Sequence, residues 1–165
     1  MSICPRVLYV DDEVGNCEMM KYYLESDMRV DVITEPDGHG AMERISKEFF
    51  DVYILDYGLP DTTGIELCKS IRMVKKNAKI IIYSALDRPV DRQRAMDGGA
   101  DKYFVKPDDI DELKAVVADY LKLKRSTGGK LRAGAKKDTQ SQLTAVERLN
   151  RANTMRSLRK CSRIT

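Results

Sequence analysis

The sequence predicts an α/β fold in which five parallel strands alternate with five helices. Short apolar runs rich in β-branched and aromatic residues recur along residues 1–121, and they are typical of strands buried on both faces of a parallel sheet. The segments between these runs carry apolar residues at helical spacing. This alternation predicts one sheet with helices on both faces and right-handed crossover connections.

The five apolar runs are taken as strands. The run KIIIYS is the clearest because it combines three consecutive isoleucines with a terminal hydroxyl residue. The run VYIL ends at Asp56 and is followed by turn residues before helical spacing resumes. Two aromatic residues just before VYIL, Phe49 and Phe50, are expected in the core. The expected strands are 6–10, 30–34, 52–55, 79–84 and 101–105.

Each expected helix follows one strand and presents an apolar stripe to the sheet. The first follows three consecutive acids, which favour a helix N-terminus because they complement the helix dipole. The last carries six apolar residues on one side of the segment after Pro107. The expected helices are one beginning near residue 14, then 41–48, 65–74, 89–97 and 110–123.

Polar side chains stand where four of the strands end. Asp11 with Asp12, then Asp56, Ser84 and Lys106, occupy these ends in chain order. Each has an ordinary alternative role as a cap, a turn former or a solvated side chain. Because the carboxyl ends of parallel strands share one edge of the sheet, these side chains are expected to converge there.

This set of side chains is typical of a site where a carboxylate is phosphorylated. Carboxylate oxygens from two or three strand ends are ligands that Mg²⁺ prefers. A lysine can neutralise one phosphoryl oxygen and a serine hydroxyl can donate to another. One carboxylate then remains as the nucleophile, so the residues indicate reversible phosphorylation of an aspartate.

The motifs together resemble the receiver domain of two-component response regulators. They are DD at 11–12, ILDYGLPDTTG around Asp56, Ser84 with Ala85, and Tyr103 with KP at 106–107. The resemblance covers about residues 3–123. It implies a flavodoxin-like, doubly wound sheet of strand order 2-1-3-4-5, an order that comes from the family and not from the residue pattern.

The resemblance also implies a metal site and a phosphoacceptor. Asp56 would accept a phosphoryl group from a phosphohistidine on a partner sensor histidine kinase or phosphotransfer protein. The cofactor would be Mg²⁺, bound by Asp12 directly, by Asp11 largely through water, and by Asp56. The backbone carbonyl of Gly58 would complete the protein's share of the metal ligands.

A second set of implied roles concerns the phosphoryl group and the response to it. Lys106 and Ser84 would hold phosphoryl oxygens, and Tyr103 would be an aromatic switch that turns inward when Ser84 moves to the phosphate. Output would be contact with a downstream protein through the face formed by the fourth helix, the fifth strand and the fifth helix.

Charge divides the chain into an acidic body and a basic tail. Residues 1–121 hold 16 Lys plus Arg against 24 Asp plus Glu, whereas residues 122–165 hold 13 against 2. Residues 124–165 are read as a basic linker and tail with a capping-box pattern, Thr144 to Glu147, that predicts a possible short helix at about 145–160. The alternatives are a solvated tail and a basic helix that contacts a partner, the acidic body or nucleic acid.

The remaining patterns point to the cytoplasm. The four cysteines are scattered without a CxxC pair, which argues against a zinc site and against a disulfide framework. The only histidine, His39, is expected to be an exposed loop residue. The N-terminus reads as neither a signal peptide nor a membrane span, and no stretch approaches the roughly 20 apolar residues that a membrane span requires.

The sequence therefore predicts a response regulator that acts as a phosphoacceptor module, not as an enzyme, with only self-catalysed phosphorylation and slow hydrolysis. One alternative is a transcriptional regulator whose basic tail binds DNA; its affinity would fall steeply with salt and be lost on truncation after Leu123. Another is a phosphohydrolase with an aspartyl-phosphate intermediate. Its second acid would stand at Gly58, which counts against this alternative because glycine provides no proton donor.

Overall fold

The computed structural model describes residues 4–122. It contains one sheet of five parallel strands in the order β2-β1-β3-β4-β5, which confirms both the predicted fold class and the strand order implied by the family resemblance. The strands are β1 (Arg6–Val10), β2 (Asp31–Glu35), β3 (Val52–Leu55), β4 (Lys79–Ser84) and β5 (Lys102–Val105).

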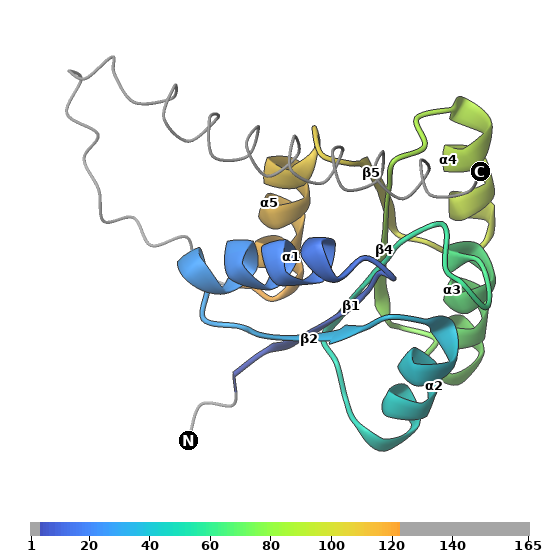
Figure 1. Cartoon of the computed structure of the whole chain (residues 1–165). Coiled ribbons are helices and arrows are strands. Elements are labelled where there is room, and N and C mark those ends of the chain that lie inside the picture. Colours follow the sequence, from blue (N-terminus) through green and yellow to red (C-terminus); the bar gives the residue numbers. More distant parts are fainter. Residues whose placement is uncertain (1–3, 123–165) are drawn as a thin grey trace, which may run out of the picture. The chain divides into compact units, whose positions relative to one another are not determined.

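Four helices connect the strands, a fifth follows the last strand, and together they cover both faces of the sheet (Figure 1). They are α1 (Val14–Asp27), α2 (Gly38–Lys47), α3 (Gly64–Val74), α4 (Pro89–Asp97) and α5 (Ile110–Tyr120). Helices α1 and α5 pack on one face, where Met20, Leu24, Leu113 and Val117 are buried against the sheet. Helices α2, α3 and α4 pack on the other face.

Helix α2 begins three residues before its expected start. The carboxylate of Asp37 accepts a hydrogen bond from the Gly40 N–H at 2.7 Å and so caps the helix. Two glycines in the first turn concealed this start because glycine is a poor helix former. His39 is exposed, as expected, but it lies in the first turn of α2 and not in a loop.

The two aromatic residues before β3 have different environments. Phe50 is 2% exposed and packs edge-on against Tyr53, with 6.0 Å between the ring centroids. Phe49 is 65% exposed, so the expectation that it belongs to the core is wrong. Phe50 occupies the core position beside Tyr53, whereas the Phe49 ring borders the ammonium group of Lys75, with Nζ 5.9 Å from the ring centroid.

None of the helices between residues 4 and 122 combines the length with the apolar character needed to cross a bilayer. The proposed helix at about 145–160 and the rest of the tail lie outside the described residues. The division of the chain at residues 123 and 124 therefore stays a prediction.

Candidate functional site

The ends of β1, β3 and β5 bring two carboxylates and one ammonium group together. Lys106 Nζ donates to Asp56 Oδ1 at 2.8 Å and to Asp11 Oδ2 at 2.5 Å. The side chain of Asp11 is 1% exposed, and those of Asp56 and Lys106 are each 15% exposed. The structure thus brings together three of the residues that the strand ends singled out, in a site that excludes most water.

Asp11 is held by more groups than the sequence analysis anticipated. The Tyr9 hydroxyl, itself fully buried, donates to Asp11 Oδ2, while Asn16 Nδ2 and the Glu13 N–H donate to Oδ1 at 3.1 and 3.0 Å. Burial raises the pKa of Asp11, but the hydrogen bonds from Lys106 and Tyr9 outweigh it, and the pKa is lowered. Asp11 is therefore a fixed carboxylate whose negative charge is well compensated.

Tyr9 could have been found from the sequence, since residues two apart on a strand point to the same face. Asn16 had no such signal because its contact depends on how α1 leaves the loop after β1. Tyr83 was also missed: its buried ring lies beneath Lys106, with Nζ 5.5 Å from the ring centroid. Burial raises the pKa of Tyr83 to about 12, so its hydroxyl stays protonated at neutral pH.

Asp56 lies at the end of β3, where its backbone N–H donates to the Val10 carbonyl at 2.8 Å. Burial raises the pKa of its carboxyl group more than the hydrogen bond from Lys106 lowers it. Asp56 and Asp11 thus share one lysine, but the pKa of Asp56 is raised while that of Asp11 is lowered. Asp56 is the less compensated of the two carboxylates.

The loop after Asp56 folds back over its backbone. A Cβ atom at Gly64 would lie only 2.1 Å from the Asp56 carbonyl oxygen, so only glycine permits this approach. Gly58, in the same loop, is exposed, and its N–H donates to Asp56 Oδ2 at 3.3 Å. A Cβ at Gly58 would lie 3.9 Å from that oxygen, so the glycine leaves one side of the carboxylate uncovered.

Ser84 and Tyr103 both form hydrogen bonds with Leu86, in the loop before α4. Ser84 Oγ accepts from the Leu86 N–H at 3.1 Å, and the Tyr103 hydroxyl donates to the Leu86 carbonyl at 2.7 Å. Tyr103 is 5% exposed, so it is buried in this structure. The structure links the two expected switch residues through one loop residue that the sequence did not single out.

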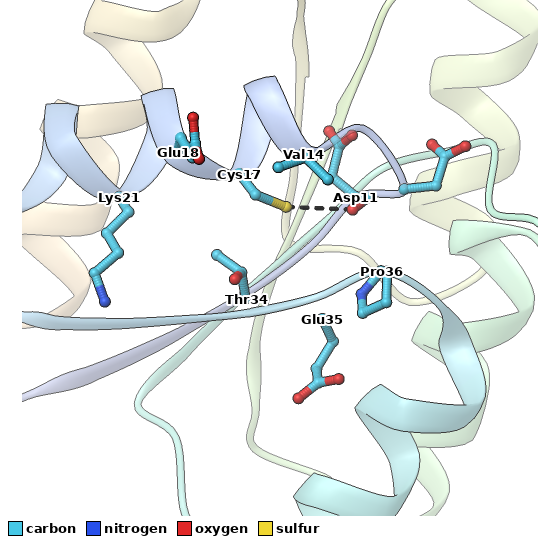
Figure 2. Close-up of a pocket in the computed structure, with 9 residues that line it drawn as sticks. Asp11, Val14, Cys17, Glu18, Lys21, Thr34, Glu35 and Pro36 are labelled. Carbon is cyan, nitrogen blue, oxygen red and sulfur yellow. Dashed lines mark hydrogen bonds between the residues drawn. The ribbon is translucent and has the colours of Figure 1, made fainter.

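Asp12 is exposed and, with Asp11, lines a pocket of about 310 Å³ between α1 and the end of β2. Figure 2 shows the thiol of Cys17 pointing from α1 to the backbone oxygen of Asp11, to which Sγ donates at 3.3 Å. Burial and the charge of Asp11 raise the pKa of Cys17 to about 11, so this thiol is not ionised at neutral pH. Asp56, Ser84 and Lys106 do not line this pocket.

The donor chemistry of Asp11, Asp12 and Asp56 fits Mg²⁺, which prefers carboxylate oxygens and keeps several of its waters. Within residues 4–122 these side chains do not form a ready cluster of three metal ligands. Lys106 Nζ instead bridges Asp11 and Asp56 and places a positive charge between these two carboxylates.

Comparison with known proteins gives a consistent picture. Residues 7–118 match the family model described as the response regulator receiver domain. The response regulator ArlR of Staphylococcus aureus is 34% identical over 117 residues, which cover 71% of this chain and 52% of that protein. The chain thus spans about half the length of the curated relatives it matches.

Solved structures show the same fold over the same part of the chain. The receiver domain of the Francisella response regulator 1452 is 33% identical, with a TM-score of 0.66, and the match covers 73% of this chain and 99% of that one. The response regulator protein TrrA from Thermotoga maritima, solved in complex with Mg²⁺-BeF, is 33% identical with a TM-score of 0.64, and the match covers 70% of this chain and 98% of that one.

Proposed function

Because the chain belongs to the family of response regulator receiver domains, which histidine kinases phosphorylate in two-component signalling, we propose that Asp56 is its phosphoacceptor. The observation that carries the proposal is the buried cluster in which Lys106 bridges Asp56 and Asp11. Of these two carboxylates, Asp56 accepts fewer compensating hydrogen bonds. Its carboxylate is also uncovered on the side next to Gly58.

In the proposed reaction an Asp56 oxygen attacks the phosphorus of a phosphohistidine, the P–N bond breaks, and the histidine leaves with its electron pair. Lys106 already touches Asp56 Oδ1, so a small movement of its flexible stem places the ammonium group on a phosphoryl oxygen. Asp11 stays fixed by Tyr9 and Asn16 while this happens.

The cofactor of the proposed reaction is Mg²⁺, held by Asp11, Asp12, Asp56 and the Gly58 carbonyl; when bound it screens the repulsion between the acceptor carboxylate and the incoming phosphoryl group. Asp12 is suited to this role because it is exposed and makes no hydrogen bond to another described residue. Ser84 would donate to a second phosphoryl oxygen after its hydroxyl turns toward Asp56.

That movement of Ser84 is proposed to carry the signal. It would end the hydrogen bond from the Leu86 N–H and release the loop whose carbonyl holds the Tyr103 hydroxyl. Arg92 of α4 lies over the Tyr103 ring, 5.1 Å from its centroid, and donates to its carbonyl at 3.1 Å. A shift of the loop would therefore change the conformation of the α4-β5-α5 face, which is the proposed contact surface for a downstream protein.

The module is proposed to signal and not to turn over substrate, since Gly58 has no side chain that could donate a proton to the group that leaves the phosphorus of a substrate. The cytoplasmic location stays a prediction, and nucleic-acid binding by the tail stays an alternative that is not favoured. The tail alternative is checked by DNA binding at rising salt, with and without residues 124–165.

Intact-mass measurement after incubation with acetyl phosphate tests the proposal. We expect one phosphoryl adduct with Mg²⁺ present, none with EDTA, and none for Asp56→Ala with Mg²⁺. Asp61→Ala is the matched control, since Asp61 lies in the same loop but is exposed and points to α2. An adduct on Asp56→Ala, or one that forms equally in EDTA, would refute the proposal.

A further inference from the structure

A second pocket, of about 350 Å³, lies at the edge of the sheet opposite Asp56, where β3 and β4 begin. Its apolar wall consists of three aromatic residues, Phe49, Phe50 and Tyr53. Lys75 and Lys76, which follow α3, also line the pocket. Nothing in the proposed phosphoryl chemistry uses these residues.

Phe49 is the unusual member of the set. Its side chain is 65% exposed, although burying a phenylalanine typically gains about 1.5–3 kcal/mol. Lys75 Nζ stands 5.9 Å from the centroid of its ring, so the exposed aromatic face borders a cation. The chain therefore presents an aromatic surface and a positive charge side by side at the mouth of a pocket.

The residues that line the pocket carry more positive than negative charge. Within residues 4–122, neither Lys75 nor Lys76 forms an ion pair. The pocket's one carboxylate, Asp51, accepts a hydrogen bond from the Arg6 N–H at 2.8 Å and is thereby engaged. This positive mouth stands out because residues 1–121 carry a net charge of −8.

Helix geometry alone explains only part of this arrangement. Lys75 is the C-cap residue of α3, and a cation there complements the helix dipole. The dipole gives no reason for an exposed Phe49 or for a pocket beside it. A ligand with an apolar group and a negative charge would account for both the exposed aromatic ring and the two lysines.

We propose that this pocket binds a segment of a partner protein in which a large apolar side chain stands next to carboxylates. The apolar side chain would fill the space against Phe49, Phe50 and Tyr53, and the carboxylates would pair with Lys75 and Lys76. Because the pocket and Asp56 lie at opposite edges of the sheet, binding does not require the phosphoacceptor. The inference goes beyond the proposed function and stands independently of it.

The test is an NMR titration of the ¹⁵N-labelled full chain with capped tripeptides. Acetyl-Glu-Phe-Glu-amide is the probe, and acetyl-Lys-Phe-Lys-amide and acetyl-Glu-Ala-Glu-amide are the matched controls. We expect saturable shifts of the Asn77 and Ala78 amides with the probe and much weaker shifts with either control. Shifts that are absent, lie elsewhere, or are equal for the lysine peptide would overturn the proposal.

Variants make the test specific to the pocket. Phe49→Ala should weaken binding roughly tenfold, and the double change Lys75→Gln with Lys76→Gln should weaken it roughly fivefold. Lys69→Gln, an exposed lysine on the same helix, is the control and should leave binding unchanged. Asp56→Ala should also bind normally, so failure of this proposal is distinguishable from failure of the phosphoacceptor proposal. Equal binding by all variants would contradict it.

Discussion

Replacing Lys106 with methionine should destabilise the domain strongly, and Mg²⁺ should reverse much of the loss. The substitution keeps the apolar stem but leaves Asp11 and Asp56, 1% and 15% exposed, without their shared cation. Removing one partner of a buried pair costs about 3–5 kcal/mol. Because Asp56 is partly hydrated and Asp11 keeps the hydrogen bonds from Tyr9 and Asn16, we expect the lower end, about 3 kcal/mol.

Magnesium ions should compensate because they can take the place of the ammonium charge. A ligand at about 100 times its Kd stabilises the folded state by about 2.7 kcal/mol. In the wild type, the positive charge of Lys106 repels the metal ion and already offsets part of the negative charge of the two carboxylates, so the gain from Mg²⁺ should be smaller there than in the variant. The stabilisation by Mg²⁺ is thus predicted to be larger for Lys106→Met than for the wild type.

The assay is urea unfolding at pH 7, followed by far-UV circular dichroism because the chain has no tryptophan. Each protein is unfolded in EDTA and in excess MgCl₂. Lys69→Met is the control: its ion pair with Glu66 is 52% and 60% exposed, and its loss should cost at most about 0.5 kcal/mol. The reasoning is refuted if Lys106→Met costs no more than Lys69→Met, or if Mg²⁺ stabilises the wild type as much as the variant.

Three further predictions concern single groups. Gly64→Ala should destabilise the fold by at least about 1–3 kcal/mol in urea unfolding, because its Cβ meets the Asp56 carbonyl at 2.1 Å; unchanged stability would show that the loop can relax. Tyr9→Phe should cost about 1.5 kcal/mol in the same assay by removing a donor to the buried Asp11 carboxylate, and a neutral result would contradict that bond. Hydrogen bonds from the Gly38 and His39 N–H groups, at the start of α2, lower the pKa of Asp61 below its usual 3.8. Asp61→Asn should therefore be less stable than the wild type at pH 7, and this difference should vanish as the pH falls below 3.8. A difference in stability that does not depend on pH would refute this.

The strand and helix pattern was predictable because the core positions carry the periodicity directly. Every residue of β3 is buried, and its sequence is a continuous apolar run. The start of α2 was not predictable in this way. The helix begins after the Asp37 cap, and its first turn contains two glycines, which are not typical of a helix. Phe49 was mistaken for a core residue because hydrophobicity alone cannot show which of two adjacent aromatic residues faces the sheet.

The convergence of Asp11, Asp56 and Lys106 followed from topology alone, since parallel strands align their carboxyl ends. The linkage of Ser84 to Tyr103 through Leu86 could not be derived because both hydroxyl groups bond to the backbone of Leu86, and a backbone partner has no sequence signature. The same holds for Gly64: the sequence marked it as a turn residue, and only the fold shows that it makes room for the Asp56 carbonyl.

The central claim, that Asp56 carries the phosphoryl group, is tested most directly by chemical trapping. Borohydride reduces an aspartyl phosphate to homoserine, and tandem mass spectrometry of the digested protein then locates the modified position. After treatment with acetyl phosphate and Mg²⁺, homoserine is predicted at position 56 alone. Homoserine at position 11 or 12, or at none in a protein shown to be folded, would contradict the account.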